Sequence, residues 1–235
     1  ETRGDVEEAI LAYRAVLDDF GADRRILGAL AALYEKAERA RDLAETLEAD
    51  LALATDPQDR INLLTRMGNV RRKSLGEIGD AIEAYRQALT IDPSTVPARD
   101  ALEELLSDEG AREEAAEILR PLYEATGADE KLVRVLDIQI EQEADLDPRL
   151  DLLARAATVC EGPLNDPARA LSYTSRGLRE AAAEPSVDEW IERAERLTER
   201  TGSWAELVEL YRSIVPDILD EDKQVSVLLR VADLA

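Results

Sequence analysis

The sequence contains no histidine and only one cysteine, Cys160. An internal disulfide bond is therefore excluded, and so is a metal cage built from histidine and cysteine ligands. Nucleophilic catalysis by a Ser/His or Cys/His pair is excluded because no histidine is available. We expect neither a metal nor a cofactor, and we expect Cys160 to be a buried small residue rather than a reactive thiol.

Long apolar runs are also missing from the sequence. No stretch approaches the roughly 20 apolar residues that a membrane-spanning helix needs, so membrane insertion is not expected. The chain starts at Glu1 without the basic and then apolar segments of a signal peptide. A cytoplasmic location is therefore favoured, although the residues leave the compartment open. Glycine-rich phosphate loops are absent too, because Gly76 and Gly79 do not have the required spacing.

Basic residues are few, with 29 Lys and Arg against 52 Asp and Glu, and the net charge is −23. A surface of this sign repels phosphate backbones and anionic lipids, so a nucleic-acid partner is not expected. Neighbouring carboxylates such as Glu7 and Glu8 are predicted to lie on solvated helix faces. A general acid needs a desolvated pocket. These patterns favour a protein that is not an enzyme.

The residues that are abundant favour helices, because alanine, leucine, glutamate and arginine dominate and aromatics make up only 4%. The clearest helix lies between Gly76 and Pro93. Its apolar residues recur at three- and four-residue steps, which gives one buried stripe on an amphipathic helix. Asp92-Pro93 ends it, because proline disfavours the helical conformation of the residue before it.

Copies of this helix recur along the chain. A shift of 72 residues places Gly4 on Gly76 and Tyr13 on Tyr85, and further copies appear at shifts of 34 and 89. The pattern predicts thirteen helices with short links, one inserted helical turn near 72–76 and an irregular extra helix near 131–143. Repeat positions that should be buried between helices are Ala9, Tyr13, Leu43, Leu47, Ala81, Tyr85, Ala115, Leu119, Ala170, Leu207 and Tyr211.

A glycine, an acidic residue, Ala-Ile, a tyrosine three residues later and a final Asp-Pro resemble the second helix of a tetratricopeptide repeat. Met67-Gly68-Asn69 similarly resembles part of the first helix of that family. The resemblance implies an all-α fold, an α-solenoid of antiparallel helix hairpins stacked into a right-handed superhelix with a concave groove. We predict a single repeat domain over residues 1–235. With the helices assigned to the repeat in this way, neither end of the chain has a polar capping helix, and an apolar helix face would be left uncovered at each end. This predicts that the chain is a piece of a longer array, or that its ends stack on other copies.

The resemblance also implies a function, a non-catalytic scaffold that binds a partner protein or peptide in the groove. Tetratricopeptide domains that hold a peptide carboxylate use asparagine, lysine and arginine on their first helices. The nearest equivalents here by position are Asn62, Asn69, Arg72 and Lys73, with Arg66 adjacent. The segment RMGNVRRK, residues 66–73, is a basic island that could receive an acidic peptide end.

Two alternatives remain open at this stage. The basic island could be a solvated face that pairs with neighbouring acids. The whole chain could instead be a structural spacer or a segment that self-associates end to end. Trp190 and Trp204 are candidate peptide anchors, but filling of the core between helices is the favoured interpretation.

Overall fold

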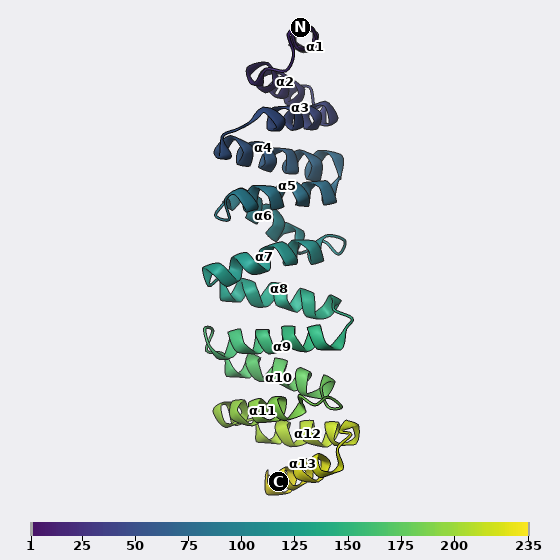
Figure 1. The fold of residues 1–235 in the computed structure, drawn as a ribbon, viewed down its shortest axis with the longest axis vertical. Coiled ribbons are helices and arrows are strands. Elements are labelled where there is room, and N and C mark those ends of the chain that lie inside the picture. The colour runs from purple at the N-terminus through teal and green to yellow at the C-terminus, as the bar shows by residue number, and fades with distance from the viewer. Residues whose placement is uncertain (1, 235) are drawn as a thin grey trace. The chain divides into compact units, whose positions relative to one another are not determined.

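The computed structural model describes residues 2–234, with side chains from residue 4 onward, and every element in that range is helical (Figure 1). The all-α class and the thirteen α-helices predicted from the sequence are confirmed. The elements in chain order are α1 (Thr2–Phe20), α2 (Arg24–Lys36), α3 (Ala40–Leu53), α4 (Pro57–Val70), a π-helical turn η1 (Arg71–Leu75), α5 (Ile78–Ile91), α6 (Val96–Leu105), α7 (Arg112–Thr126), α8 (Asp129–Gln142), α9 (Leu146–Glu161), α10 (Pro167–Glu180), α11 (Val187–Thr201), α12 (Trp204–Ile214), a 3-10 turn η2 (Val215–Asp217) and α13 (Glu221–Leu234).

Local chemistry explains where several helices begin and end. Asp56 and Asp166 each accept the backbone N–H three residues later, at 3.0 and 2.9 Å, and so satisfy a free donor of the first turn. Pro57 and Pro167 follow at the first helical position, where no N–H is needed. Gly202 ends α11 with φ of 74°, a conformation that other residues rarely adopt.

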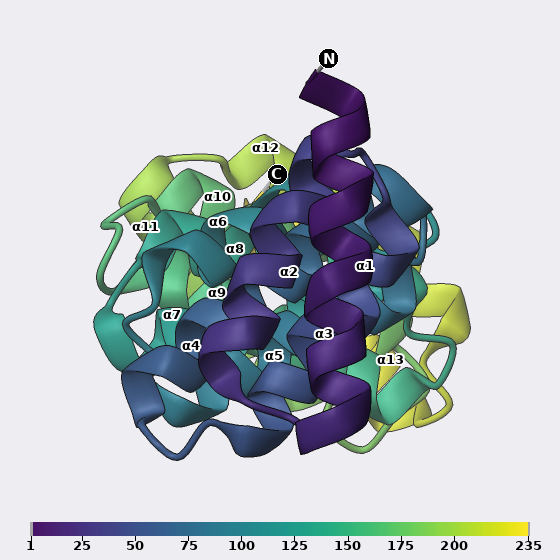
Figure 2. The ribbon, with the colours of Figure 1, turned by 90° about the horizontal axis from the view of Figure 1, so that it is seen from above.

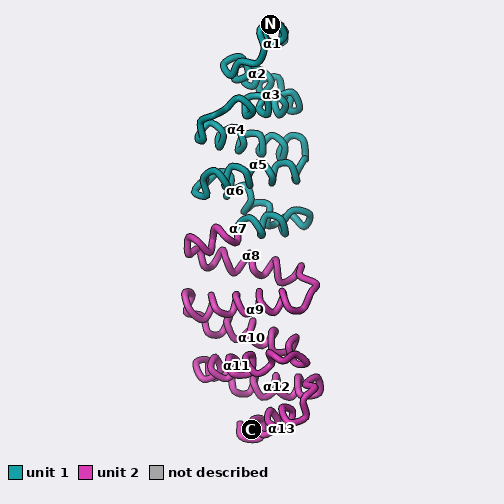
Figure 3. The backbone as a smooth tube through the Cα atoms, viewed as in Figure 1, with its two compact units in different colours: residues 1–119 teal, residues 120–235 magenta. Residues whose placement is uncertain are grey.

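The chain divides into two compact units, Glu1–Leu119 and Arg120–Ala235 (Figure 3). The boundary falls inside α7, which also contains Pro121. A proline within a helical pattern predicts a kink or an early end, but α7 continues to Thr126. The single repeat domain over residues 1–235 stays a prediction.

In unit 1 each helix from α1 to α5 packs against the next one along the chain. Figure 2 shows α1 lying beside α2. Gly68 permits a close approach of α4 to α5, because a Cβ on this residue would lie 2.6 Å from Cε1 of Tyr85. The Tyr85 ring is fully buried, and its hydroxyl donates to Oδ1 of Asn69 at 2.9 Å. Ring packing and a hydrogen bond therefore join the two helices of this hairpin.

The inserted turn that the sequence predicted near 72–76 is present. α4 passes directly into η1, so helical backbone extends from Pro57 to Leu75 before Gly76 ends it with φ of 70°. A π turn accommodates an extra residue within a helix without breaking it. The two adjacent arginines of the basic island, Arg71 and Arg72, are both placed on this turn.

Most of the predicted repeat positions are buried, namely Leu43, Leu47, Ala81, Tyr85, Ala115, Leu119, Ala170, Leu207 and Tyr211. Ala9 is half-buried. The prediction was wrong for Tyr13, which is 37% exposed. Among the described residues α1 packs only against α2, so the face that carries Tyr13 has no neighbour and Ile10 is the α1 residue that is buried.

In unit 2 the helices from α8 to α13 likewise pack against their neighbours in sequence. α8 covers most of the range 131–143, and it packs against α9. That this helix is extra to the repeat stays a prediction. Gly177 of α10 faces Trp190 of α11 so closely that a Cβ would lie 2.3 Å from the indole Cζ3. The hydroxyl of Tyr211 donates to Glu195 at 2.9 Å, across the same 16 residues that separate Tyr85 from Asn69. The two hairpins thus share one internal hydrogen-bond pattern.

Candidate functional site

A groove of about 350 Å³ lies beside α4 in unit 1. Its floor and one wall come from successive turns of α4, because positions 58, 62, 65 and 69 share a helix face. The opposite side comes from the link between α5 and α6. The lining residues are Gln58, Ile61, Asn62, Thr65, Arg66, Asn69, Asp92, Thr95 and Pro97. Three of the five residues predicted to bind a peptide therefore lie together here: Asn62, Arg66 and Asn69.

Neutral hydrogen-bonding groups dominate this groove. The Gln58 amide donates to Oδ1 of Asn62 at 3.4 Å, and Oδ1 of Asn69 accepts from Tyr85. Each amide also carries N–H donors, so the Asn62 and Asn69 nitrogens remain able to donate elsewhere. Thr65 is 8% exposed, and its hydroxyl oxygen is buried without a hydrogen-bond partner. A buried polar group in this state is usually satisfied by a ligand or water.

The charged groups at the groove are already engaged within the protein. Arg66 forms an ion pair with Glu35 of α2 at 2.7 Å. The carboxylate of Asp92 accepts from the hydroxyl and the backbone N–H of Ser94, at 2.7 and 2.9 Å. These hydrogen bonds lower the pKa of Asp92, so it stays ionised. The groove therefore offers amide and hydroxyl groups rather than free charge.

Arg72 lies outside the groove, contrary to the grouping expected from the sequence. Its side chain is 11% exposed and pairs with Glu104 of α6 at 2.7 Å. It also donates to the carbonyl of Ala101 at 3.3 Å. The π turn directs this guanidinium into the packing between helices, where it connects neighbouring elements instead of facing a ligand.

Lys73 is exposed but does not line the groove. Its positive charge contributes to lowering the pKa of Glu104, behind the larger effect of Arg72. Arg71, the first residue of the same turn, forms an ion pair with Glu48 of α3 at 3.3 Å. The basic island is therefore largely paired with acids from neighbouring helices, as the alternative interpretation of this segment anticipated.

Sequence reasoning missed Gln58, Thr65 and Thr95 as lining residues. Gln58 and Thr65 lie four residues before and three residues after Asn62, so helical spacing from that asparagine would have identified both. No spacing pattern in the sequence connects Thr95 with Asn62. Thr95 reaches the groove only because the link between α5 and α6 folds back toward α4.

Neither a reactive thiol nor a metal-binding cluster is found within the described residues 2–234. Cys160 is buried, and desolvation raises the pKa of its thiol to about 11, which makes it a poor nucleophile at neutral pH. Within residues 2–234 no three His, Cys, Asp or Glu side chains are arranged to hold a metal ion. No helix in that part of the chain is both long and apolar enough to cross a membrane.

Three comparisons place the chain among known proteins. Residues 26–61 match the sequence model of the tetratricopeptide repeat, which spans most of α2, all of α3 and the start of α4. No curated protein sequence matches the chain.

Several solved structures are similar to the chain in the arrangement of their helices. The crystal structure of MamA is 20% identical with a TM-score of 0.41, over 76% of this chain and 90% of the other. The TPR2AB domain of yeast Sti1 in complex with pHSP90 is 17% identical with a TM-score of 0.38, over 97% and 90%. The C-terminal part of a TPR repeat-containing protein from Cytophaga hutchinsonii is 14% identical with a TM-score of 0.37, over 97% and 96%.

The functional meaning of the family match is general, because tetratricopeptide repeats mediate protein–protein interactions through stacked helical hairpins. The match begins at Ile26 in α2 and ends at Ile61 in α4, so it covers the hairpin directly before the groove. In this all-α chain of successive helical hairpins, residues 26–61 therefore match the family model of the tetratricopeptide repeat.

Proposed function

We propose that the chain is a non-catalytic interaction scaffold, and that the unit 1 groove holds an extended segment of a partner protein or peptide. The observation that carries this proposal is the set of neutral amides, Gln58, Asn62 and Asn69, around the buried and unpartnered hydroxyl of Thr65. An enzyme, a nucleic-acid binder and a cofactor carrier find no support in this groove. The cytoplasmic location expected from the sequence remains a prediction.

The chemistry of the groove suits a peptide backbone. An extended segment presents N–H and C=O groups that lack partners, and carboxamide side chains both donate to and accept from them. The Thr65 hydroxyl can do the same from the floor of the groove. Because Arg66 and Asp92 are engaged internally, recognition here does not require a charged peptide end.

The test is selection of peptides from a displayed random library on the full chain, followed by affinity measurements on the enriched peptides. Variant Gln58→Ala/Asn62→Ala/Thr65→Val removes hydrogen-bonding groups and keeps the helix, so affinity should fall about tenfold or more. Gln87→Ala/Thr90→Val, which changes exposed positions of α5 outside the groove, should bind like the wild type.

A second variant separates binding from structure. Arg72→Met removes the ion pair with Glu104, so it should lower the free energy of unfolding by about 1–3 kcal/mol while peptide affinity stays unchanged. If Arg72→Met loses peptide binding at a temperature where the variant is folded, Arg72 takes part in peptide binding. Equal affinity of the wild type and the triple groove variant would contradict the proposal.

A second candidate function rests on a different observation. α1 exposes Leu11, Val16 and Phe20, and α13 exposes Val225, Leu228 and Leu229. Apolar side chains gathered on one helix are typical of interaction surfaces. They favour a structural segment that associates with other copies of the chain.

A further inference from the structure

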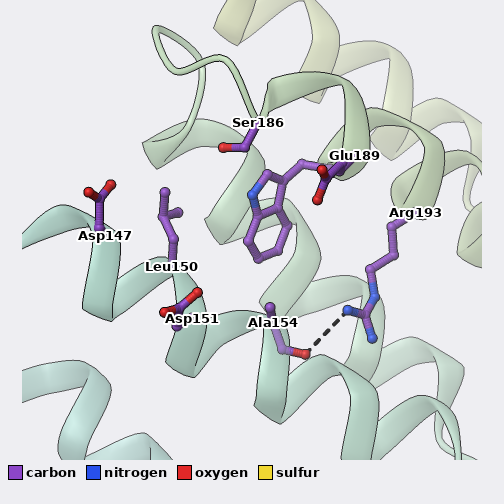
Figure 4. A pocket seen from close by; sticks show the side chains of 8 residues that line it. Asp147, Leu150, Asp151, Ala154, Ser186, Glu189 and Arg193 are labelled. Carbon is purple, nitrogen blue, oxygen red and sulfur yellow. Dashed lines mark hydrogen bonds between the residues drawn. The ribbon is translucent and has the colours of Figure 1, made fainter.

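A second groove lies in unit 2, between α9 and α11, and has a volume of about 280 Å³ (Figure 4). α9 supplies one side of this groove, and α11 with the residue before it supplies the other. The lining residues are Asp147, Leu150, Asp151 and Ala154 on the first side, and Ser186, Glu189, Trp190 and Arg193 on the second.

This groove is the repeat counterpart of the groove in unit 1. The shift of 89 residues that aligns α4 with α9 places Gln58 on Asp147, Ile61 on Leu150, Asn62 on Asp151 and Thr65 on Ala154. All eight of these residues line their respective grooves. The position of the groove is thus repeated, while its amides are replaced by carboxylates. The two grooves therefore differ in the ligand chemistry that they favour.

The three carboxylates of the second groove have no cation paired with them. Within residues 2–234 no ion pair or side-chain hydrogen bond involves Asp147, Asp151 or Glu189. Carboxylates that share a site repel one another, and a bound cation relieves that repulsion. The groove is consequently a place where positive charge is stabilised.

Arg193 lines the same groove, but its guanidinium already has hydrogen-bond and ion-pair partners on α9. Its guanidinium donates to the carbonyl of Ala154 at 3.2 Å (Figure 4) and to Oγ1 of Thr158 at 3.0 Å. It also forms an ion pair with Glu161 at 3.3 Å. The carboxylate with which Arg193 pairs is therefore Glu161 at the end of α9, and not one of the groove carboxylates.

Trp190 provides an independent indication of a ligand. It lines the groove and is 7% exposed, and its indole N–H has no acceptor within the described residues. The ring is buried while the N–H faces the groove, so this donor is available to a ligand there. A metal ion cannot accept a hydrogen bond, whereas a peptide carbonyl can. The ligand should therefore carry both a cation and an acceptor.

We propose that the α9–α11 groove binds a basic peptide through an arginine residue. The guanidinium would be held by Asp147, Asp151 and Glu189, as planar guanidinium groups are by carboxylates. A main-chain carbonyl of the same peptide would accept from the Trp190 indole. This site is separate from the unit 1 groove in position and chemistry, so either proposal can fail without the other.

The test uses the full chain with Trp204→Phe, which leaves Trp190 as the only tryptophan. Its fluorescence is followed at about 0.15 M salt, where the Debye length is about 8 Å, during titration with capped Gly-Ser-Arg-Ser-Gly, and with the same peptide carrying neutral citrulline in place of arginine. We expect saturable binding of the arginine peptide and none of the citrulline peptide. Asp147→Asn/Asp151→Asn/Glu189→Gln should weaken binding about tenfold or more.

The matched control removes the same number of charges from unit 1. Glu8→Gln/Glu45→Gln/Glu117→Gln, all at exposed positions that do not line the groove, should bind within about twofold of the parent, because salt screens surface charges that make no contact with the peptide. Equal weakening in the two triple variants would show attraction to net charge and would overturn the proposal. So would equal binding of the citrulline peptide, or the absence of binding at millimolar peptide.

Discussion

Two glycines set how closely the helices of two hairpins approach. Gly68 and Gly177 lie against the rings of Tyr85 and Trp190, and each ring occupies the space that a Cβ would need. The rings are buried, so they have little freedom to move aside. At these positions the side chain of the partner helix is accommodated only because the glycine has none.

The different surroundings of Gly177 and Gly28 predict opposite effects on stability when each is replaced by alanine. Gly177→Ala forces a methyl group against the Trp190 ring and should lower the free energy of unfolding by about 1–3 kcal/mol. Gly28→Ala lies in the exposed interior of α2 with nothing within 4 Å of its Cβ, and should raise it by about 0.5–1 kcal/mol. Urea unfolding followed by circular dichroism measures both, and stabilisation by Gly177→Ala would contradict the packing described for α10 and α11.

The end of α9 is held to α11 by a cluster of charges on two elements. Glu161 accepts from Nε of Arg196 at 3.2 Å and lies 3.3 Å from Arg193 and 3.5 Å from Arg200. Arg193 and Thr158 are also connected there. Three cations near the carbonyl end of a helix are favoured by its dipole. The hydrogen bond from Arg196 and the charges of all three arginines lower the pKa of Glu161.

A defined pH dependence follows from that pKa. Because the pKa of Glu161 is lower in the folded chain, its stabilising effect is complete above the unfolded pKa of about 4.3 and is lost as the pH falls through the folded value. Glu161→Gln should therefore lower the thermal midpoint at pH 7, and its difference from the wild type should shrink toward pH 3. Glu192→Gln, at an exposed position without an ion pair, serves as the control. A difference that is constant from pH 7 to pH 3 would rule out this role of the carboxylate.

At the scale of the whole molecule, net charge opposes association while exposed apolar surface favours it. The charge of −23 repels a second copy at long range. On α1, Leu11 and Phe20 are largely exposed, and α13 has a comparable apolar face. Salt screens the repulsion without weakening apolar contacts, so ionic strength decides between the two effects.

Self-association should therefore increase with protein concentration and with salt. The molar mass measured by light scattering should rise between about 10 mM and 500 mM salt, where screening becomes short-ranged. Leu11→Ser/Phe20→Ser should reduce that rise, whereas Gln87→Ala should leave it unchanged. A constant monomer mass for the wild type under all these conditions would contradict self-association. A structural spacer would then be the alternative to a binding scaffold.

The candidate site shows why sequence reasoning found only part of a groove. Asn62 and Asn69 were identified from the resemblance to carboxylate-binding tetratricopeptide domains, and they lie together because their spacing places them on one face of α4. Arg72 was placed with them because it is basic and nearby in the chain. The π turn and Glu104, which is 32 residues away, determine its orientation instead. Pairing across helices depends on distances that a linear pattern does not contain.

The sequence by itself determined the helical class, the number of helices and most of the buried positions, because apolar periodicity and capping residues act within a few residues of one another. Only the tertiary structure decided which polar groups remain available. Packing left the Thr65 hydroxyl buried without a partner, and it placed the Trp190 side chain against the second groove. Tyr13 matched Tyr85 in sequence but differs from it in burial, because burial depends on a neighbouring helix and α1 has one on a single side.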